Sequence, residues 1–485
     1  MENFKNIVKN LYEKFKEYKN VIALLLLGIC LTFIGLSTHS FNIDEIFSLY
    51  VSRNWSIMTK TLWNVEANMW LYYLILHFWQ LLGVNEFIVR GLSAIFAVAS
   101  IPVIYLIGKS LFDKKAALIS VIFMIFNIFF VITAQLARGY SLSLFLTLLS
   151  MYFFIHFEKK RKYKLFYVIS SILSVYAHFY ALFIILSQVL IAILTKKLRI
   201  YFVAFFSVVI FLTPIFLSPS FRSHQVDWIE RPTFRNLIGT SYVFSGDFPP
   251  LLIIYSLLFF FITPFLIKNI KNTKYIITTT WLFTPVITAF VFSLFVKPIF
   301  QSVYFLTSLP PFFILAAFSI TKIIDRNARH LFLGAIVVLS ILRLTLWYAK
   351  DTRYKWVFHN NEDDWRLVTN LISVNARKGD AITFYGYYNR LPYEFYAKKE
   401  IPLVIEIASG AYDLSGGSLF PEPNFDLISN LQYKRVWLVL RNSDNGILNR
   451  DQQFAEIKKA LDEKYREEYV YDFPGLTLFL YILEG

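Results

Sequence analysis

The sequence predicts a polytopic α-helical membrane protein with a small α/β domain at its C-terminal end. Hydrophobic residues make up 56% of the 485 residues and aromatic residues 19%, whereas charged residues make up 17%. The mean hydropathy is +0.52, and a soluble chain of this length does not need so much apolar surface. Long uncharged runs recur up to about residue 350, and the remainder of the chain is charged and rich in turn signals.

The apolar runs define a membrane module over residues 21–350. Most of them reach the ~17–25 residues that a spanning helix requires. The runs lie at residues 21–37, 67–85, 91–108, 116–137, 139–157, 165–195, 200–221, 248–267, 275–296, 298–321 and 331–342. The run at 165–195 is too long for one helix, so we expect a hairpin that turns near His178. About 11–13 transmembrane helices are expected on this reading.

The net charge of +15 reflects the positive-inside pattern and does not indicate nucleic-acid binding. Lysines and arginines concentrate in the short loops at residues 159–162, 196–199, 268–274 and 322–329. Such loops are cytoplasmic in multi-pass membrane proteins. The basic segment 1–20 is expected to be cytoplasmic too, followed by an uncleaved first span. The single cysteine, Cys30, excludes disulfides and cysteine-rich metal sites.

Residues 351–485 alternate strand-like and helix-like segments, which predicts a layered α/β domain. Strands are expected at 381–385, 402–407 and 435–440, helices at 392–399 and 453–467, and a terminal hairpin at 469–483 that turns at Pro474-Gly475. Counting outward from the basic loops places this domain outside the cell membrane, on the side of Asp44 and Arg138.

The same count leaves one crossing unaccounted for between Asp44 and the basic loop 109–115. Either the run 67–85 or the run 116–137 is therefore expected not to be a simple span. Two outer loops are longer than connectors need to be, at residues 38–66 and 218–248. The first has the aromatic and polar alternation of helices that lie in the membrane interface, and long loops on one face are often functional.

Asp44 and Glu45 follow the first apolar run, at the point where the chain is expected to exit the hydrocarbon layer of the membrane. Carboxylates at the mouth of a membrane protein are costly to desolvate and are natural candidates for base chemistry. The alternative is a solvated loop with ordinary acidic residues. Three further patterns share this outer face: Glu66 to Tyr73, Gly83 to Arg90, and Ala134 to Tyr140.

In order and spacing, these four patterns resemble the membrane glycosyltransferases of the protein O-mannosyltransferase and aminoarabinose transferase superfamily, which share the glycosyltransferase-C fold (family 39-like). The resemblance is good over residues 38–157, weaker to residue 350 and only architectural in the tail. It implies an inverting transfer of a sugar from a polyprenyl-phosphate donor lipid to an acceptor hydroxyl at the outer membrane face. The acceptor would be a glycan, a lipid or a protein, and Asp44 would be the general base with Glu45 beside it.

The chain departs from that family where the donor phosphate is expected to bind. The family often has a His- or Lys-Pro-Pro element, where this chain has Asn68-Met69-Trp70, and an Arg-Tyr pair, where it has Gln301 to Tyr304 without an arginine. A departing phosphate needs cations or N–H donors. The candidate substrate-binding residues are Glu66, Asn68, Tyr72, Arg138, Tyr140, His178, Lys297 and Tyr304, with Arg222 and Arg231 as further cations.

Structural roles compete with several of these assignments. Glu66 is equally a favourable charge near a helix N-terminus, and His178 equally a hydrogen-bonded turn residue. Glu86 and Arg90, four residues apart, are expected to pair on a helix. The segment 363–366 is expected to cap a helix and anchor the tail domain.

No cofactor is required by the sequence. It has no nucleotide-binding glycine pattern and no zinc-ligand spacing, and a divalent cation held by Asp44 and Glu45 is left open. The expected partners are the membrane, the donor lipid and the acceptor, without nucleic acid. Two other classes remain: a transporter or flippase of lipid-linked sugars, and a non-catalytic membrane assembly protein. The former usually shows internal repeats and polar residues near the midplane, which this chain lacks.

Overall fold

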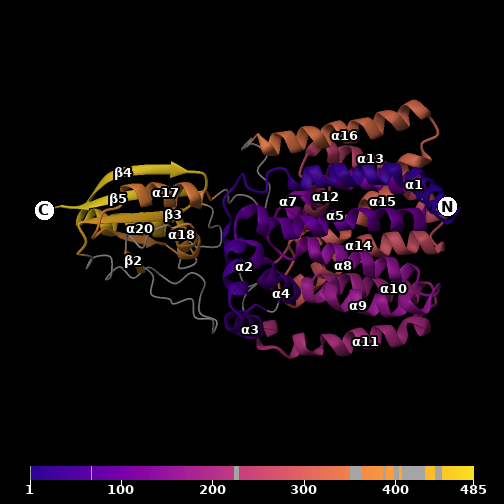
Figure 1. Ribbon diagram of the computed structural model, residues 1–485, viewed down its shortest axis with the longest axis horizontal. Coiled ribbons are helices and arrows are strands. Elements are labelled where there is room, and N and C mark those ends of the chain that lie inside the picture. Colours follow the sequence, from indigo (N-terminus) through magenta and orange to yellow (C-terminus); the bar gives the residue numbers. More distant parts are fainter. Residues whose placement is uncertain are drawn as a thin grey trace.

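The computed structural model describes residues 2–66, 68–222, 229–349, 363–385, 389–397, 403–406, 432–442 and 450–484, with side chains from residue 18 onward except those of residues 222, 403–406, 450, 451 and 453. A bundle of long helices forms one part of the molecule, and a β-sheet flanked by helices forms the other (Figure 1). The N-terminus lies at the far end of the bundle from the sheet (Figure 1).

The bundle is built from the apolar runs that the sequence marks. Its helices are α1 (Glu2–Phe33), α5 (Glu86–Leu111), α6 (Lys114–Ile125), α7 (Ile128–Ala134), α8 (Tyr140–Ile155), α9 (Arg161–Ala177), α10 (Ala181–Leu194), α11 (Leu198–Leu217), α13 (Pro249–Lys268), α14 (Thr273–Phe295), α15 (Leu309–Lys322) and α16 (Arg326–Tyr348). The buried core is continuous through most of them. Exposed phenylalanine, valine and isoleucine side chains line α11 and α13, as expected of helices that face lipid.

By length and composition, 6 helices of the described chain are able to span a membrane, or up to 7 if the bent pair α6 and α7 counts as one span. This is fewer than the 11–13 expected from the apolar runs. The physical reason is that several runs fold as shorter helices: α8 has 16 residues, α9 has 17 and α10 has 14. The run 165–195 is the expected hairpin, with α9 ending at Ala177 and α10 beginning at Ala181.

Both runs suspected of not being simple spans are irregular. The run 116–137 breaks into α6 and α7, which meet at an angle of 63°. The run 67–85 contains only the ten-residue helix α4 (Trp70–Trp79) and the short 3-10 helix η1 (Gln80–Leu82). Asn127 caps α7 by accepting from the backbone N–H of Phe129 and Phe130, so the break at 126–127 is a new helix start.

The basic loops gather at one end of the bundle. Lys109 lies over the ring of Tyr18 in α1, Lys274 over that of Phe112, and Lys322 over that of Phe265. These contacts join the middle of α1 to the end of α5, and the ends of α5, α13, α14 and α15 to one another. The sheet domain lies at the opposite end (Figure 1), which is the arrangement that the loop charges predict.

Short elements cover the bundle end that faces the sheet. They are α2 (Ile43–Arg53), α3 (Trp55–Asn64), α4, η2 (Pro219–Arg222), α12 (Phe234–Phe244) and η3 (Ser302–Ser308). In Figure 1, α2 and α3 lie across the ends of the long helices, between the bundle and the sheet domain. The loop 38–66 therefore contains two short helices, α2 and α3, where the sequence predicts helices that lie in the membrane interface.

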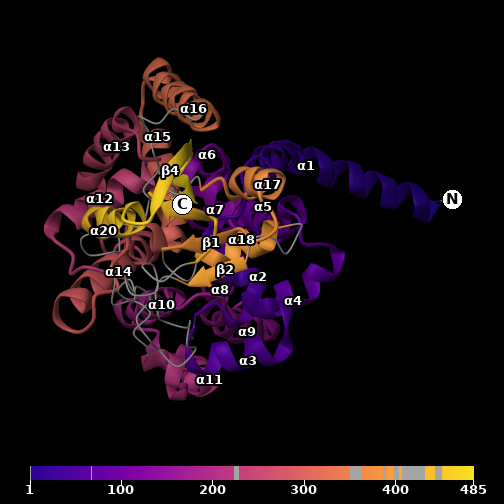
Figure 2. The ribbon, with the colours of Figure 1, turned by 90° about the vertical axis from the view of Figure 1, so that its left-hand side faces the viewer.

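The sheet domain has five strands in the order β2-β1-β3-β5-β4. Strands β1 (Ala381–Phe384), β2 (Leu403–Glu406) and β3 (Arg435–Arg441) are parallel, and β4 (Tyr465–Phe473) with β5 (Leu476–Leu483) adds an antiparallel hairpin. Helices α17 (Trp365–Asn375) and α18 (Arg390–Tyr396) pack on one face, and α20 (Arg450–Asp462) packs on the other. The tail is thus the layered α/β unit expected, with α17 and α20 on different sides of it in Figure 2, and its hairpin turns at Pro474-Gly475.

Candidate active site

The start of α2 places Asp44 and Glu45. Asn42 is the N-cap, and its side chain accepts from the backbone N–H of Glu45 at 2.9 Å. In return, Glu45 Oε2 accepts from the backbone N–H of Asn42 at 3.0 Å. This reciprocal capping box fixes the first turn of the helix, so the two adjacent carboxylates point in different directions.

Glu45 is fully buried and bound on every side. Its oxygens accept from Nε and Nη2 of Arg90 at 2.8 and 2.7 Å, and Oε1 also accepts from the backbone N–H of Ala137 at 2.9 Å. Burial raises the pKa of Glu45, but the Arg90 guanidinium and the N–H groups of Ala137 and Asn42 lower it more, so that its pKa lies below the usual 4.5. Glu45 is therefore an ionised anchor that joins α2, α5 and the segment before Arg138.

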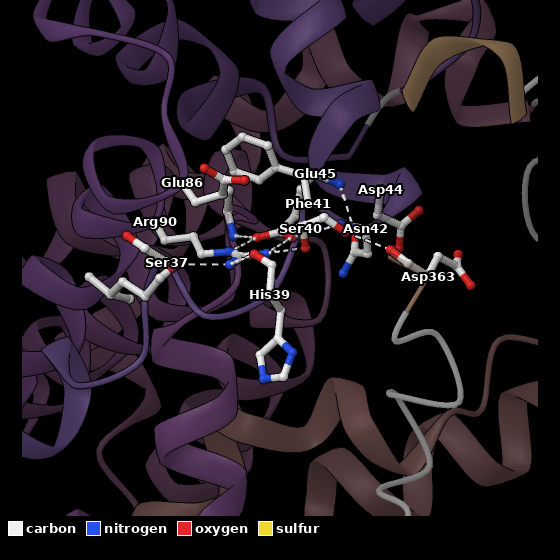
Figure 3. Close-up of polar contacts among 12 residues, drawn as sticks. Ser37, His39, Ser40, Phe41, Asn42, Asp44, Glu45, Glu86, Arg90 and Asp363 are labelled. Atoms are coloured by element: carbon white, nitrogen blue, oxygen red, sulfur yellow. Dashed lines mark hydrogen bonds and ion pairs between the residues drawn. The ribbon is translucent and has the colours of Figure 1, made fainter. Parts of the chain in front are cut away.

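Arg90 uses the rest of its guanidinium to hold the chain before α2 (Figure 3). Nη1 donates to the carbonyls of Leu36 and His39, and Nη2 donates to that of Ser40, at 2.8 to 2.9 Å. The expected pair of Arg90 with Glu86 is not formed, because the guanidinium is taken up by Glu45 and by three backbone carbonyls. Glu86 instead faces the tail domain, where it lies 3.5 Å from Nη1 of Arg366.

Asp44 has the opposite environment to Glu45. Its side chain is exposed, and its carboxylate has no hydrogen bond or ion pair with any residue that the structure describes. Its backbone carbonyl accepts from the hydroxyl of Ser48 at 2.8 Å. The carboxylate acts electrostatically on Arg138, Glu66 and Tyr140. A carboxylate in the first turn of a capped helix, with no described partner on its oxygens, is suited to accept a proton.

Arg138 lies beside Asp44, in the turn between α7 and α8. Its Nη1 donates to the hydroxyl of Tyr73 at 3.0 Å and to that of Ser48 at 3.3 Å. Its Nε is buried and has no partner among the described residues. Neutral hydroxyls do not neutralise the guanidinium, so its positive charge can still pair with an anionic ligand. The turn itself is fixed by the bond from Ala137 to Glu45 and by Ser93, whose hydroxyl donates to the carbonyl of Arg138 at 3.2 Å.

Glu66 and Asn68 lie in the segment that precedes α4. Glu66 is half-buried, and burial together with Asp44 raises its pKa against the opposing effects of Arg138 and the Asn68 N–H. The side chain of Asn68 accepts from the backbone N–H of Phe179 at 2.9 Å, which fastens this segment to the turn of the α9–α10 hairpin. Met69 follows with a φ of 64°, a left-handed conformation that is uncommon outside glycine.

His178 stands at that turn inside an aromatic group. Its ring centroid is 5.2 Å from that of Tyr140, 5.5 Å from that of Tyr180 and 5.6 Å from that of Tyr304. Burial and Arg138 lower its pKa to about 3, so the imidazole is neutral at physiological pH. Nδ1 accepts from the backbone N–H of Tyr180, which places the proton on Nε2. Nε2 is buried and without a partner in the described structure.

Comparisons with known proteins agree with this architecture. Residues 65–219 match the model of the dolichyl-phosphate-mannose-protein mannosyltransferase family. The chain is similar to ArnT from Cupriavidus metallidurans bound to undecaprenyl phosphate, with a TM-score of 0.63, 12% identity, and coverage of 96% of this chain and 98% of that one. It is also similar to the oligosaccharyltransferase AglB from Archaeoglobus fulgidus in complex with an inhibitory peptide and a dolichol-phosphate, with a TM-score of 0.53, 11% identity, and coverage of 96% and 74%. No curated protein matches the chain.

The chain therefore has the fold of these solved glycosyltransferases, and its residues 65–219 match the mannosyltransferase family model. The expected fold class and enzyme class, a membrane glycosyltransferase, are confirmed by the family match together with the fold. The matched range contains Arg138 and His178 but begins after Asp44. The choice of Asp44 as a candidate base therefore depends on its own geometry.

The structure separates the other candidate residues by location. Tyr72 is fully buried, and its hydroxyl bonds to that of Ser93 at 3.1 Å. Because Ser93 in turn donates to the carbonyl of Arg138, Tyr72 stabilises the turn at Arg138 indirectly. Lys297 is half-buried after α14, two residues before the Ile299 carbonyl that accepts from the hydroxyl of Tyr180. Arg231 is exposed. The side chain of Arg222 lies outside the described residues.

Glu45 is not available for the metal site that the sequence left open, because both of its oxygens accept from Arg90. Over the described ranges, no three His, Cys, Asp or Glu side chains gather closely enough to hold a metal ion.

Sequence reasoning missed Tyr73 and Ser48 as the groups that hold Arg138, and it missed the partner of Arg90. One signal was readable in the sequence: Asn42 followed three residues later by Glu45 is a capping-box pattern. It indicates that Glu45 serves the helix start and leaves Asp44 as the free carboxylate.

Proposed function

We propose that this glycosyltransferase moves a sugar from a polyprenyl-phosphate donor to an acceptor hydroxyl at the outer face of the membrane, with Asp44 as the general base. The acceptor oxygen attacks the anomeric carbon, and the bond from that carbon to the phosphate oxygen breaks. The proton of the hydroxyl passes to Asp44, and polyprenyl phosphate departs with the bonding electrons. A single displacement of this kind inverts the anomeric configuration.

One observation carries the proposal: an unpaired carboxylate and an incompletely paired guanidinium lie side by side on a braced framework. Asp44 has no side-chain partner among the described residues, and Arg138 has a buried Nε without one. Ser48 links the two, since its hydroxyl donates to the Asp44 carbonyl and accepts from Arg138. Base and cation are the two groups that displacement at a phosphate-activated sugar requires.

Arg138 is proposed to stabilise the departing phosphate, with the Nε2–H of His178 as a neutral donor beside it. A phosphate leaving group is stable without protonation, so a second carboxylic acid is not needed, in contrast to glycoside hydrolysis. Tyr140 and Tyr304, whose rings lie 6.2 Å apart and within 20° of parallel, are proposed to border the sugar. Lys297 is a second cation on the same side, and no cofactor is needed for this chemistry.

The donor class is supported by the lipids bound to solved proteins of the same fold. ArnT was solved with undecaprenyl phosphate and AglB with a dolichol-phosphate, and the matched family is described as using dolichyl-phosphate-mannose. The outward orientation is supported by the basic loops, which gather at the bundle end opposite Asp44. The N-terminus would then be cytoplasmic, and the tail domain would be extracytoplasmic, above the site.

The test is transfer by the purified chain in liposomes, supplied in turn with polyprenyl-phosphate-linked hexoses and pentoses. The acceptors are a lipid A-like lipid, a hydroxyl-bearing peptide and a cell-wall glycan. We expect one donor to release polyprenyl phosphate only when an acceptor is present, giving a product of inverted anomeric configuration by NMR. Movement of labelled donor between leaflets without any sugar transfer would contradict the proposal and favour a flippase.

A further inference from the structure

Tyr396, at the end of α18 in the tail domain, makes two hydrogen bonds across the junction with the membrane module. Its hydroxyl accepts from the backbone N–H of Phe41 at 2.8 Å and donates to Oε1 of Glu86 at 2.7 Å. Burial raises the pKa of Tyr396 well above its ordinary value, so the hydroxyl stays protonated. One tail side chain thus joins the segment before α2 to the first turn of α5.

Further tail contacts fall on the same short segment. Arg366 donates to the carbonyls of Ser37 and Thr38, and the hydroxyl of Ser40 donates to the carbonyl of Asp363 at 2.6 Å. The ring of Phe395 meets that of Phe41 edge to face, with centroids 5.5 Å apart. The described residues of the tail therefore contact nearly every position from Ser37 to Phe41, just before the helix that bears Asp44.

Only two residues, Asn42 and Ile43, separate Phe41 from Asp44. Phe41 is followed by Asn42, the N-cap of α2, and Asp44 lies in the first turn. Arg90 holds the same segment from the membrane side, through the Ser40 carbonyl and by stacking over the Phe41 ring at 5.1 Å. The start of α2 is consequently fixed between two partners: Arg90 within the bundle and Tyr396 in the tail.

We propose that Tyr396 is a positioning residue for the base, so that docking of the tail domain sets the place of Asp44. This inference rests on the proposed function. Loss of the hydroxyl leaves the Phe41 N–H and the Glu86 carboxylate without their shared partner and lets the start of α2 shift. Displacements of about 1 Å at a reacting group reduce rates by up to about 10²-fold.

The experiment compares Tyr396→Phe with the parent, full length and in liposomes, with the polyprenyl-phosphate donor and acceptor that the parent uses. Tyr469→Phe is the matched control, since Tyr469 lies on β4 and is 53% exposed. We expect Tyr396→Phe to lower kcat about tenfold or more, with an unchanged KM for the donor and only a small fall in melting temperature from the unpaired Phe41 N–H. Tyr469→Phe should match the parent in all three.

The same substitution in an Asp44→Asn background separates positioning from general structure. If Tyr396 acts through the base, Tyr396→Phe has no further effect on the residual transfer of Asp44→Asn. An unchanged kcat for Tyr396→Phe would overturn the inference, and so would an equal loss in both backgrounds. Failure of Asp44→Asn itself to reduce transfer would instead count against the proposed function, which keeps the two outcomes distinct.

Discussion

Asp44 and Glu45 are adjacent in the chain, yet one carboxylate is exposed and the other is 0% exposed. The difference follows from the capping box: the third residue of α2 turns back to its N-cap and into the bundle, while the second faces outward. A buried carboxylate with Arg90 and two backbone N–H donors is a structural group. The exposed one beside Arg138 is available to a substrate.

The Glu45–Arg90 pair predicts a pH-dependent stability. Because the folded-state pKa of Glu45 lies below 4.5, its contribution is present above about pH 4.5 and is lost as pH falls through the lowered value. Glu45→Gln strands the buried Arg90 charge, at a cost of about 3–5 kcal/mol at neutral pH. Melting temperatures from about pH 7 down to pH 3 should show a gap between parent and variant that narrows in acid.

The exposed Glu463→Gln is the control for that series, and it should track the parent at every pH. A gap between the parent and Glu45→Gln that stays constant down to the lowest pH would contradict the assignment of Glu45 as an ionised anchor.

Arg138 and Arg231 are competing candidates for the phosphate cation. We expect Arg138→Lys to reduce transfer about 10²- to 10³-fold, because lysine lacks the fork that reaches Tyr73 and Ser48 while still facing a ligand. Arg231→Lys, at an exposed position, should leave transfer unchanged. Steady-state rates with the polyprenyl-phosphate donor decide between them, and a loss at Arg231 alone would move the phosphate site to the loop 218–248.

The elements around the site meet at Gly139, between Arg138 and the start of α8. A Cβ at this position would lie 2.6 Å from the carbonyl oxygen of Ala177, 3.1 Å from the Met69 side chain and 3.3 Å from that of Tyr72. The absence of a side chain there lets α4, α8 and the end of α9 approach one another. The Gly139 backbone N–H also points to the sulfur of Met69 at 3.4 Å.

Gly139→Ala is therefore expected to destabilise the protein by about 1–3 kcal/mol, as overpacking does, and to displace Arg138 with it. Gly91→Ala is the matched control, because a Cβ at that helical position meets nothing within 4 Å and alanine is the better helix former. The melting temperature in detergent and the transfer rate should both fall for Gly139→Ala and should stay at the parental values for Gly91→Ala. Equal behaviour of the two variants would contradict the packing account.

At the scale of elements, the sequence predicted the hairpin 165–195, helices in loop 38–66 and the order of the tail elements, because each leaves a local pattern. It pointed to runs 67–85 and 116–137 as the place of an irregular span, but it did not predict the residue at which the second run breaks. The bend between α6 and α7 follows from Asn127, which caps one helix and also donates to the carbonyl of Phe244 at 3.0 Å. The partners of Arg90 and Tyr396 could not be predicted from local sequence patterns either, because they lie 45 or more residues away along the chain.

Over the whole molecule, charge and contact place the functional groups at one end. The basic loops occupy the other end, and the tail domain covers the end that carries Asp44 (Figures 1 and 2). The sequence predicted this polarity from loop charges alone. The contacts that seat the tail on the segment 37–41 were not predicted, because they join parts of the chain more than 300 residues apart.

The membrane orientation is testable by labelling in a Cys30→Ser background. Lys271→Cys reports on the basic end and Glu463→Cys on the tail, and both positions are exposed. In intact cells, a membrane-impermeant maleimide should label Glu463→Cys and should reach Lys271→Cys only after permeabilisation. The reverse pattern would place the proposed site on the cytoplasmic side.

The central claim is that Asp44 takes the proton of the acceptor hydroxyl, and the direct measurement is the transfer rate of Asp44→Asn in liposomes. The control Glu463→Gln also neutralises one exposed carboxylate and should transfer at the parental rate. We predict that Asp44→Asn lowers kcat by about 10²- to 10⁴-fold while the donor still binds. A kcat equal to that of the parent would contradict the assignment of Asp44 as the base.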